Sequence, residues 1–413
     1  MAGMGFPADQ SDVLKAGIAK IDITPTKPVM LSGYGARKGL SQGVHDPLSA
    51  RAVAFEQNGK HLVLVSTDFI GFYGGTAEAF RKTIMEACRL EPSELFLSAI
   101  HTHSAPAPSL DSSKGHTNNI EYTKLLESKL VAVVQDAISR VVPVQIGTGS
   151  GVSPVGVNRR EVISGKDGKS RIRLGRNPNL ITDREVQVLK IAHTENSDLN
   201  AVVFAYATHS TSLGGKNYFI SGDVHGLAEQ FIEKYRGNEF IASAFAGASG
   251  NIDPWFRVLP EFKSGNGWIP EPVLLGTMLG EEVVTVFNGI QKLSASGPVK
   301  TAFKTIDLPG KPGDEDQVST NTLITPLNVT VGRVGDVAFV GLGGEIFNEI
   351  GKAIKIASPF STTFIITHCN GAAGYLPAES NYAEGGYEVE CSHFAPSASE
   401  KVIQEVVQML GCL

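Results

Sequence analysis

The sequence lacks the features that define several classes of protein. It has only four cysteines in 413 residues and no CxxC pair, which excludes a disulfide scaffold and a cysteine-based structural zinc site. No apolar run reaches the roughly 18 residues that a membrane-spanning helix needs. Lys and Arg number 36 against 42 Asp and Glu, and no basic stripe is visible, which argues against non-specific nucleic-acid binding.

What is present indicates a globular protein with a sizeable core. Hydrophobic residues make up 42% of the chain, charged residues 19%, and the mean hydropathy is near zero, which is the balance typical of soluble domains. The N-terminus has no basic segment followed by an apolar one, so it does not read as a signal peptide. Both a cytoplasmic chain and an exported chain without its leader fit this pattern, and the oligomeric state is not indicated.

Short apolar segments alternate with longer helical patterns, which predicts an α/β fold with mixed β-sheets flanked by helices. We expect a tail over 1–14 and a single large catalytic domain over 15–413. Stretches rich in Gly, Pro, Ser and Asn predict loops at 102–119, 158–182 and 254–270. Strands are predicted at 53–55, 61–65, 94–99, 186–191, 201–207, 240–244, 337–341 and 363–368, and helices at 77–89, 120–140, 224–235, 274–290, 345–357 and 400–410.

Histidines follow two of the predicted strands. His101 and His103 come after the strand at 94–99, and their spacing of two places both rings on one side of an extended segment. That arrangement fits two ligands of one metal, or one ligand and one substrate contact. Two histidines satisfied by backbone or water remain the alternative. His209 follows the strand at 201–207 in the same way.

Further polar residues lie at the ends of predicted elements. Asp223 is expected to cap the helix at 224–235, and His225 in its first turn to have a structural role. Asp253 follows the strand at 240–244, either as an exposed site group or as part of an ordinary Asn/Asp/Pro turn. Glu345 opens a predicted helix after a glycine-rich segment that has no Walker lysine, so a nucleotide site is not indicated. Tyr375 lies in another glycine-rich turn, where a tyrosine is usually a packing residue, and a phenolate ligand and a hydrogen-bond donor are the alternatives.

The order of these motifs resembles the catalytic domain of the neutral/alkaline (non-lysosomal) ceramidase family over nearly the whole chain. Each motif is weak alone, but the ordered set is specific. The segments that carry the resemblance are 16–25 (AGIAKIDITP), 33–35 (GYG), 46–52 (DPLSARA), 65–68 (VSTD), 98–104 (SAIHTHS), 158–159 (NR), 209–213 (HSTSL), 220–223 (ISGD), and the tail from Gly374-Tyr375 to Tyr387-Glu388.

The resemblance implies a zinc-dependent amide hydrolase. The family's zinc ligands correspond here to His101, His209, Glu345 and Tyr375. Family residues that line the reaction centre correspond to the catalytic candidates His103, Arg159 and Tyr387. A bound zinc ion of this kind lowers the pKa of its water and polarises the scissile carbonyl.

The chain departs from the family pattern in two ways. Asp253 stands where the family has a reaction-centre serine in its GDVSP motif. We therefore add Asp253 to the catalytic candidates, as a group that orients or deprotonates water. Ceramidases also carry a C-terminal immunoglobulin-like domain, and the about 40 residues after Tyr375 leave no room for one. We therefore expect a small soluble substrate and no action on ceramide in bilayers.

The sequence thus predicts a zinc hydrolase that cleaves an amide or related carbonyl bond by means of metal-activated water. An esterase using the same site is one alternative. A non-catalytic metal- or ligand-binding protein with a ceramidase-like fold is another, motivated by the missing serine. A second divalent cation is a further expectation, near Asp68 and Asp253, because two carboxylates at one sheet edge favour one.

Overall fold

The computed structural model describes residues 13–194, 200–237, 239–255, 270–311 and 323–413. Its largest sheet has eight strands in the order β13-β11-β10-β6-β1-β3-β4-β5. The β4–β5 and β11–β13 pairs are parallel and the other pairs are antiparallel, so the predicted mixed sheet is confirmed. The bounds are β1 (Lys15–Asp22), β3 (Ser49–Gln57), β4 (Lys60–Thr67), β5 (Leu95–Ala99), β6 (Val142–Val152), β10 (Glu185–His193), β11 (Asn200–Tyr206) and β13 (Ile241–Ala246).

A second sheet of four strands packs against the first. Its order is β15-β16-β17-β19, with β15 (Val299–Pro309), β16 (Ile324–Val334), β17 (Val337–Leu342) and β19 (Thr362–Ile366). Side chains of both sheets form one buried cluster, in which Phe55 of β3 packs on Phe339 of β17 with ring centroids 6.4 Å apart. Burial on both faces explains why these strands read as nearly continuous apolar runs.

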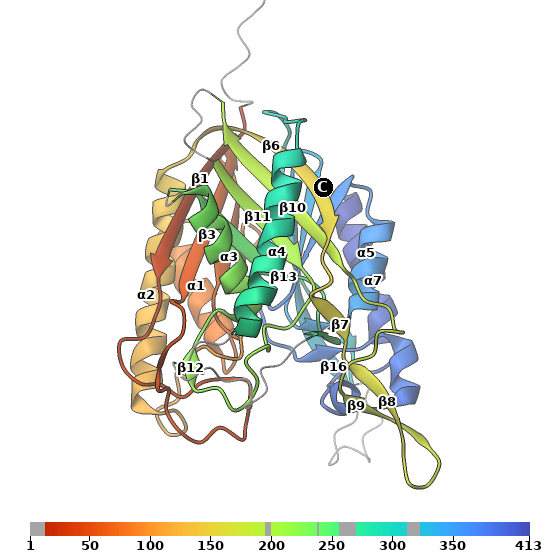
Figure 1. Cartoon of the computed structure of the whole chain (residues 1–413). Helices are drawn as coiled ribbons and strands as arrows, with labels where there is room; N and C mark the ends of the chain where they lie inside the picture. The colour runs from red at the N-terminus through yellow and green to blue at the C-terminus, as the bar shows by residue number, and fades with distance from the viewer. Residues whose placement is uncertain (1–12, 195–199, 238, 256–269, 312–322) are drawn as a thin grey trace, which may run out of the picture.

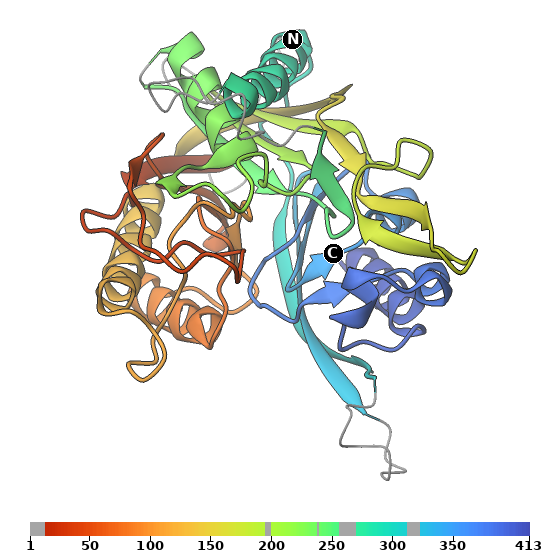
Figure 2. The same cartoon turned by 60° about the horizontal axis from the view of Figure 1, so that its bottom comes forward.

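Helices cover the outer faces of both sheets (Figures 1 and 2). The large sheet is covered by α1 (Thr76–Cys88), α2 (Thr117–Ser139), α3 (Asp223–Arg236) and α4 (Pro270–Gly289), and the small sheet by α5 (Asn348–Ala357) and α7 (Ala398–Gly411). The protein therefore has four layers in the order helix–sheet–sheet–helix, and apolar side chains fill the space between neighbouring layers. Within the described ranges, no helix is both long and apolar enough to cross a membrane.

The large sheet curls so that its two edges meet. Strand β13 at one edge contacts β5 at the other, and the Ser66 hydroxyl of β4 donates a hydrogen bond to the Ala244 carbonyl of β13. The loops that follow β5, β11 and β13 therefore emerge at one place, although these strands are far apart in the strand order. This curl brings the histidines that follow β5 and β11 together.

Short paired strands hold the loops around that place. The pairs are β2 (Gly43–Val44) with β12 (Phe219–Ile220), β7 (Gly156–Asn158) with β14 (Ile252–Pro254), β8 (Arg160–Ser164) with β9 (Ser170–Leu174), and β18 (Glu345–Ile346) with β20 (Tyr375–Leu376). Two short helices follow, η3 (Glu379–Glu384) and α6 (Tyr387–Glu390). The backbone hydrogen bonds of the strand pairs fix the loops around this place.

The predicted strands and helices all have counterparts, with three corrections. The helix expected from 345 begins at Asn348, so Glu345 lies in β18. The loop expected at 158–182 contains the β8–β9 hairpin, whose strands pair from Arg160↔Leu174 to Ser164↔Ser170. Asp223 is the first residue of α3, not its cap, and its carboxylate accepts the backbone N–H groups of Ser212 and Leu213 in the preceding loop. Residues 256–269 of the loop expected at 254–270 lie outside the described residues.

Candidate metal centre

Three histidines and a glutamate converge where the sheet edges meet. The ring nitrogens of His101, His103 and His209 lie within 4.8 Å of one another. Glu345 Oε2 lies 3.5 Å from His101 Nε2 and 3.4 Å from His209 Nε2, and His103 Nε2 lies 3.2 Å from His101 Nε2. All of these side chains except that of the half-buried His103 are buried. The sequence prediction that His101 and His103 face the same way is therefore confirmed.

Backbone carbonyls orient two of the three rings. His101 Nδ1 lies 2.6 Å from the Ile70 carbonyl, and His209 Nδ1 lies 2.8 Å from the Ser249 carbonyl. A carbonyl only accepts hydrogen bonds, so each Nδ1 carries the proton and each Nε2 presents a lone pair to the cluster. Metal-binding histidines are held by the same kind of outer contact.

The donor set fits a zinc ion. Glu345 Oε2 is buried and accepts no hydrogen bond from the described residues, although two imidazole nitrogens lie within 3.5 Å of it. An unpartnered carboxylate oxygen facing two lone pairs is unfavourable unless a cation lies among them. Imidazole nitrogens and carboxylate oxygens are ligands that Zn²⁺ prefers. His101, His209 and Glu345 would hold such an ion.

The electrostatics of the cluster favour neutral imidazoles beside an ionised carboxyl. Burial lowers the pKa of His103 well below its usual value, and the neighbouring His101 and His209 lower it further. Burial also lowers the pKa of His209, with Arg159 adding to the effect. Burial opposes ionisation of Glu345, whereas positive charge at His101 and His209 lowers the pKa of its carboxyl well below the usual range. With neutral imidazoles, a cation bound among the three groups would supply that charge. Neutral imidazoles and an ionised carboxylate are the forms that bind metals.

Arg159 brings a positive charge to the edge of the cluster. It lies in the break between β7 and β8, and its Nη1 is 3.1 Å from His209 Nε2. The same nitrogen donates to Asp253 Oδ1 at 3.2 Å, and Nη2 donates to Tyr375 Oη at 3.1 Å. The second oxygen of Asp253 pairs with Arg176 Nη1 at 3.1 Å. Asp253 is thus a buried partner of two guanidinium groups, a placement that disfavours the role of proton acceptor expected from the sequence.

The tyrosines lie on the other side of Glu345. Tyr375 is the strand partner of Glu345 in the β18–β20 pair, and the pKa of its phenol is raised well above the usual value by burial and by Glu345. Tyr387 opens α6, is half exposed, and packs edge-on against Tyr375 with ring centroids 5.8 Å apart. The structure therefore gathers all four predicted ligands and the catalytic candidates into one region.

Sequence reasoning missed three residues of this region. Tyr73 donates a hydrogen bond to Glu345 Oε1 at 3.3 Å. His368 stacks on His101 with ring centroids 3.9 Å apart and planes at 12°. Tyr34 packs edge-on against His103 at 5.0 Å. Of these three residues, only His368 had a signal in the sequence, because it ends a predicted strand much as His101 follows one.

An arginine lies beside each carboxylate at which the second cation was expected, which disfavours that cation. Asp68 Oδ2 accepts hydrogen bonds from the N–H and hydroxyl of Ser49 and lies 3.8 Å from Arg51 Nη1. Asp253 pairs with Arg159 and Arg176. A guanidinium already supplies the positive charge that a second metal would bring.

His225 has the structural role predicted for it. Its Nδ1 lies 2.8 Å from the Ser210 hydroxyl and its Nε2 lies 3.1 Å from the Tyr206 carbonyl, so both nitrogens have partners. Burial lowers its pKa to about 4. His225 therefore has no lone pair to offer to the neighbouring cluster.

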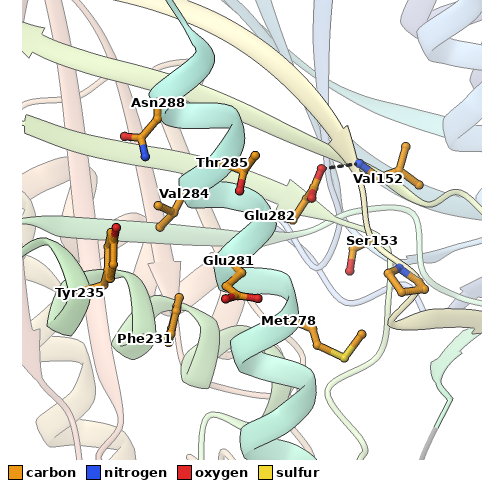
Figure 3. A pocket seen from close by; sticks show the side chains of 11 residues that line it. Val152, Ser153, Phe231, Tyr235, Met278, Glu281, Glu282, Val284, Thr285 and Asn288 are labelled. Carbon is orange, nitrogen blue, oxygen red and sulfur yellow. Dashed lines mark hydrogen bonds between the residues drawn. The ribbon is translucent and has the colours of Figure 1, made fainter.

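A separate pocket of about 480 Å³ lies between α3, α4 and the end of β6 (Figure 3). Glu282 of α4 accepts the backbone N–H of Val152 at 2.9 Å across it. Neither histidine nor arginine lines this pocket. It therefore offers no imidazole ligand and is not part of the histidine cluster.

Comparisons with known proteins point to one family. The family model described as neutral/alkaline non-lysosomal ceramidase, N-terminal, matches residues 14–256. A neutral ceramidase from Pseudomonas aeruginosa is 24% identical over 281 residues, which is 63% of this chain and 40% of that protein. Neutral ceramidase B from Dictyostelium discoideum is 28% identical over 276 residues, 60% of this chain and 36% of that protein. The match thus spans two fifths or less of these relatives.

A solved structure shares the fold. The crystal structure of neutral ceramidase from Pseudomonas aeruginosa superposes with a TM-score of 0.76 and 19% sequence identity. The superposition covers 97% of this chain and 74% of that one. The predicted α/β architecture is therefore confirmed over the whole described chain, including the C-terminal part that lies beyond the family match.

Proposed function

Because the chain belongs to the neutral/alkaline non-lysosomal ceramidase family, we propose that it is a zinc-dependent hydrolase that cleaves the amide bond of an N-acylated lipid. The approach of His101 Nε2 and His209 Nε2 to within 3.5 Å of Glu345 Oε2 carries the proposal. Tyr375 is the strand partner of Glu345 and completes the ligand set implied by the family. A zinc ion bound there supplies Lewis-acid polarisation and an acidified water.

The surrounding side chains supply the remaining chemistry. Arg159 Nη2 donates one N–H to Tyr375, and its other N–H can donate to the carbonyl oxygen of an amide as negative charge develops on it. His103 is kept neutral by burial, so its imidazole can accept the proton of the attacking water and return it to the leaving amine. The Asp253 carboxylate holds Arg159 and Arg176 in place through ion pairs.

The relatives revise the expected substrate. The matched proteins are named neutral ceramidases, and ceramide is a lipid amide with a long acyl chain. They therefore favour an N-acyl lipid over the small soluble substrate expected from the sequence. Asp253 in place of the family serine does not affect this choice, because its carboxylate pairs with arginines.

A panel of substrates tests the proposal. We would incubate the zinc-loaded protein with N-acylsphingosine in detergent micelles, with a soluble N-acyl amino acid, and with a p-nitrophenyl ester, and measure the released amine or phenol. We expect amine release from the lipid amide. Hydrolysis of the ester alone would favour the esterase alternative. Zinc binding without cleavage of any member would favour a non-catalytic binding protein.

A further inference from the structure

One carboxylate contacts two consecutive arginines at the edge of the site. Arg159 Nε donates to Glu388 Oε1 at 2.7 Å, and Arg160 Nη1 donates to Glu388 Oε2 at 3.0 Å. Glu388 and Arg160 are fully buried, and Arg159 is 4% exposed. Adjacent residues of a regular strand point to opposite faces. Here the two side chains converge because the chain turns between β7 and β8, where Glu161 N–H bonds to the Arg159 carbonyl.

Glu388 holds Arg159 from the side that faces away from the cluster. The two terminal nitrogens of Arg159 are engaged with His209, Asp253 and Tyr375. Its Nε donates to Glu388, and one N–H of Nη2 has no hydrogen-bond partner among the described residues and is left for the substrate carbonyl. A guanidinium is a rigid planar fork, so fixing Nε also fixes the direction of both terminal nitrogens. The carboxylate also offsets part of the charge of two buried guanidinium groups, which are expensive to leave unpaired.

The same residue anchors a second site group. Glu388 follows Tyr387 in α6, and the Tyr387 ring packs against Tyr375. The bonds from Arg159 and Arg160 thus tie α6 to the β7–β8 junction, which is more than two hundred residues away in sequence. Among the described residues, Glu388 forms no hydrogen bond or ion pair with the histidines or with Glu345, so its influence on the metal centre passes through Arg159 and the α6 segment.

We propose that Glu388 is a positioning residue that holds Arg159 in the orientation from which it binds the substrate carbonyl. The proposal rests on the proposed function, in which Arg159 contacts that carbonyl. It predicts that removing the Glu388 charge impairs turnover only while Arg159 is present.

Glu384 provides a matched control. Its carboxylate accepts a hydrogen bond from Arg160 Nη2 at 3.0 Å, belongs to the same charge network, and has no contact with Arg159. Its side chain is 41% exposed. Glu384→Gln therefore removes one negative charge from the network and leaves the Arg159–Glu388 bond in place.

The test is a double-mutant cycle in the full-length zinc-loaded protein. Wild type, Glu388→Gln, Arg159→Ala, the double variant and Glu384→Gln are compared on a fluorescent short-chain N-acylsphingosine in micelles. We expect Glu388→Gln to lower kcat about 10–100-fold with KM within about threefold. In the Arg159→Ala background it should change kcat less than about twofold. Glu384→Gln should stay within about twofold of wild type, and zinc content should not change in any variant.

A second cycle uses binding of octanoate, a carboxylate of the product class, measured by calorimetry. One case is that the wild type cleaves the probe. Additive effects of the two mutations, or an effect of Glu384→Gln as large as that of Glu388→Gln, would then overturn the positioning role of Glu388 and leave the proposed function standing. If the wild type does not cleave the probe but octanoate binding shows the coupling, the proposed function fails and positioning stands. Absence of both turnover and octanoate binding overturns both.

Discussion

Arg159 and Asp253 form a buried ion pair, with Arg159 Nη1 3.2 Å from Asp253 Oδ1. The other oxygen of Asp253 pairs with Arg176 Nη1 at 3.1 Å, and the carboxylate is 1% exposed. Two guanidinium groups stabilise the charged carboxylate and occupy both of its oxygens. The residue that replaces the family serine therefore serves as a charge partner for the arginines.

Replacing Asp253 with Asn tests this role. The variant keeps the shape of the side chain and removes the charge that balances two buried arginines, which typically costs about 3–5 kcal/mol of stability. We expect a lower midpoint in urea unfolding, an unchanged zinc content, and a turnover reduced about 10–100-fold through misplacement of Arg159. Wild-type stability in Asp253→Asn would contradict the ion-pair account.

The histidines should differ sharply in their effect on metal binding. His101→Ala and His209→Ala each remove a nitrogen that faces Glu345, so each should reduce zinc content at equilibrium with a chelator by at least about tenfold. His225→Asn is the control, because the nearby His225 is also buried but has both nitrogens bonded to protein groups. The His225→Asn variant should keep its zinc. Retention of zinc in the His101/His209 double variant would exclude the proposed centre.

Tyr375 and Tyr73 provide a second matched pair. Both phenols lie close to Glu345, but only Tyr375 belongs to the ligand set that the family implies, whereas Tyr73 donates a hydrogen bond to Glu345 Oε1. Tyr375→Phe should weaken zinc binding more than Tyr73→Phe, by about tenfold or more in a competition titration with a chelator. Equal effects would show that Tyr375 acts only through contacts with Glu345 and Arg159.

The metal-free protein should lose stability as pH falls. Burial lowers the pKa of His225 from 6.5 to about 4, and burial also lowers the pKa of His103, His209 and His368. Between pH 6.5 and about 4, the unfolded chain binds more protons than the folded one, so protonation favours unfolding. The contribution from these histidines is complete above pH 6.5 and declines toward pH 4. Urea unfolding should show a slope of about 1.4 kcal/mol per pH unit for each such proton. A flat profile would contradict buried neutral histidines.

The sequence predicted elements and single side chains better than it predicted their mutual contacts. His101, His103 and His209 were identifiable because each follows an apolar strand, and strand ends in α/β folds carry functional groups. Glu345 and Tyr375 were singled out from their local sequence, but their place in one ligand set came only from the family resemblance. Their local patterns suggested a helix start and a turn, whereas the structure places them opposite each other in the β18–β20 pair.

The missed residues have no local signature because their contacts are distant in sequence. Tyr73 and Glu345 are separated by 272 positions, and His368 meets His101 only because both sheets bring strand ends to one place. Asp253 was expected to act as a base because its arginine partners were unknown. Arg176 lies beyond the β8–β9 hairpin, in a stretch that the sequence predicted as a loop. Such pairings depend on the fold rather than on spacing.

Reconstitution with zinc tests the central claim most directly. The protein is stripped with a chelator, zinc is added back in fractions of one equivalent, and amine release from N-acylsphingosine in micelles is measured at each step. The account predicts no activity in the stripped protein and a linear recovery that ends at one zinc per chain. It also predicts no recovery in a Glu345→Gln variant at the same zinc levels. Full activity in the stripped protein, or recovery that does not depend on Glu345, would contradict it.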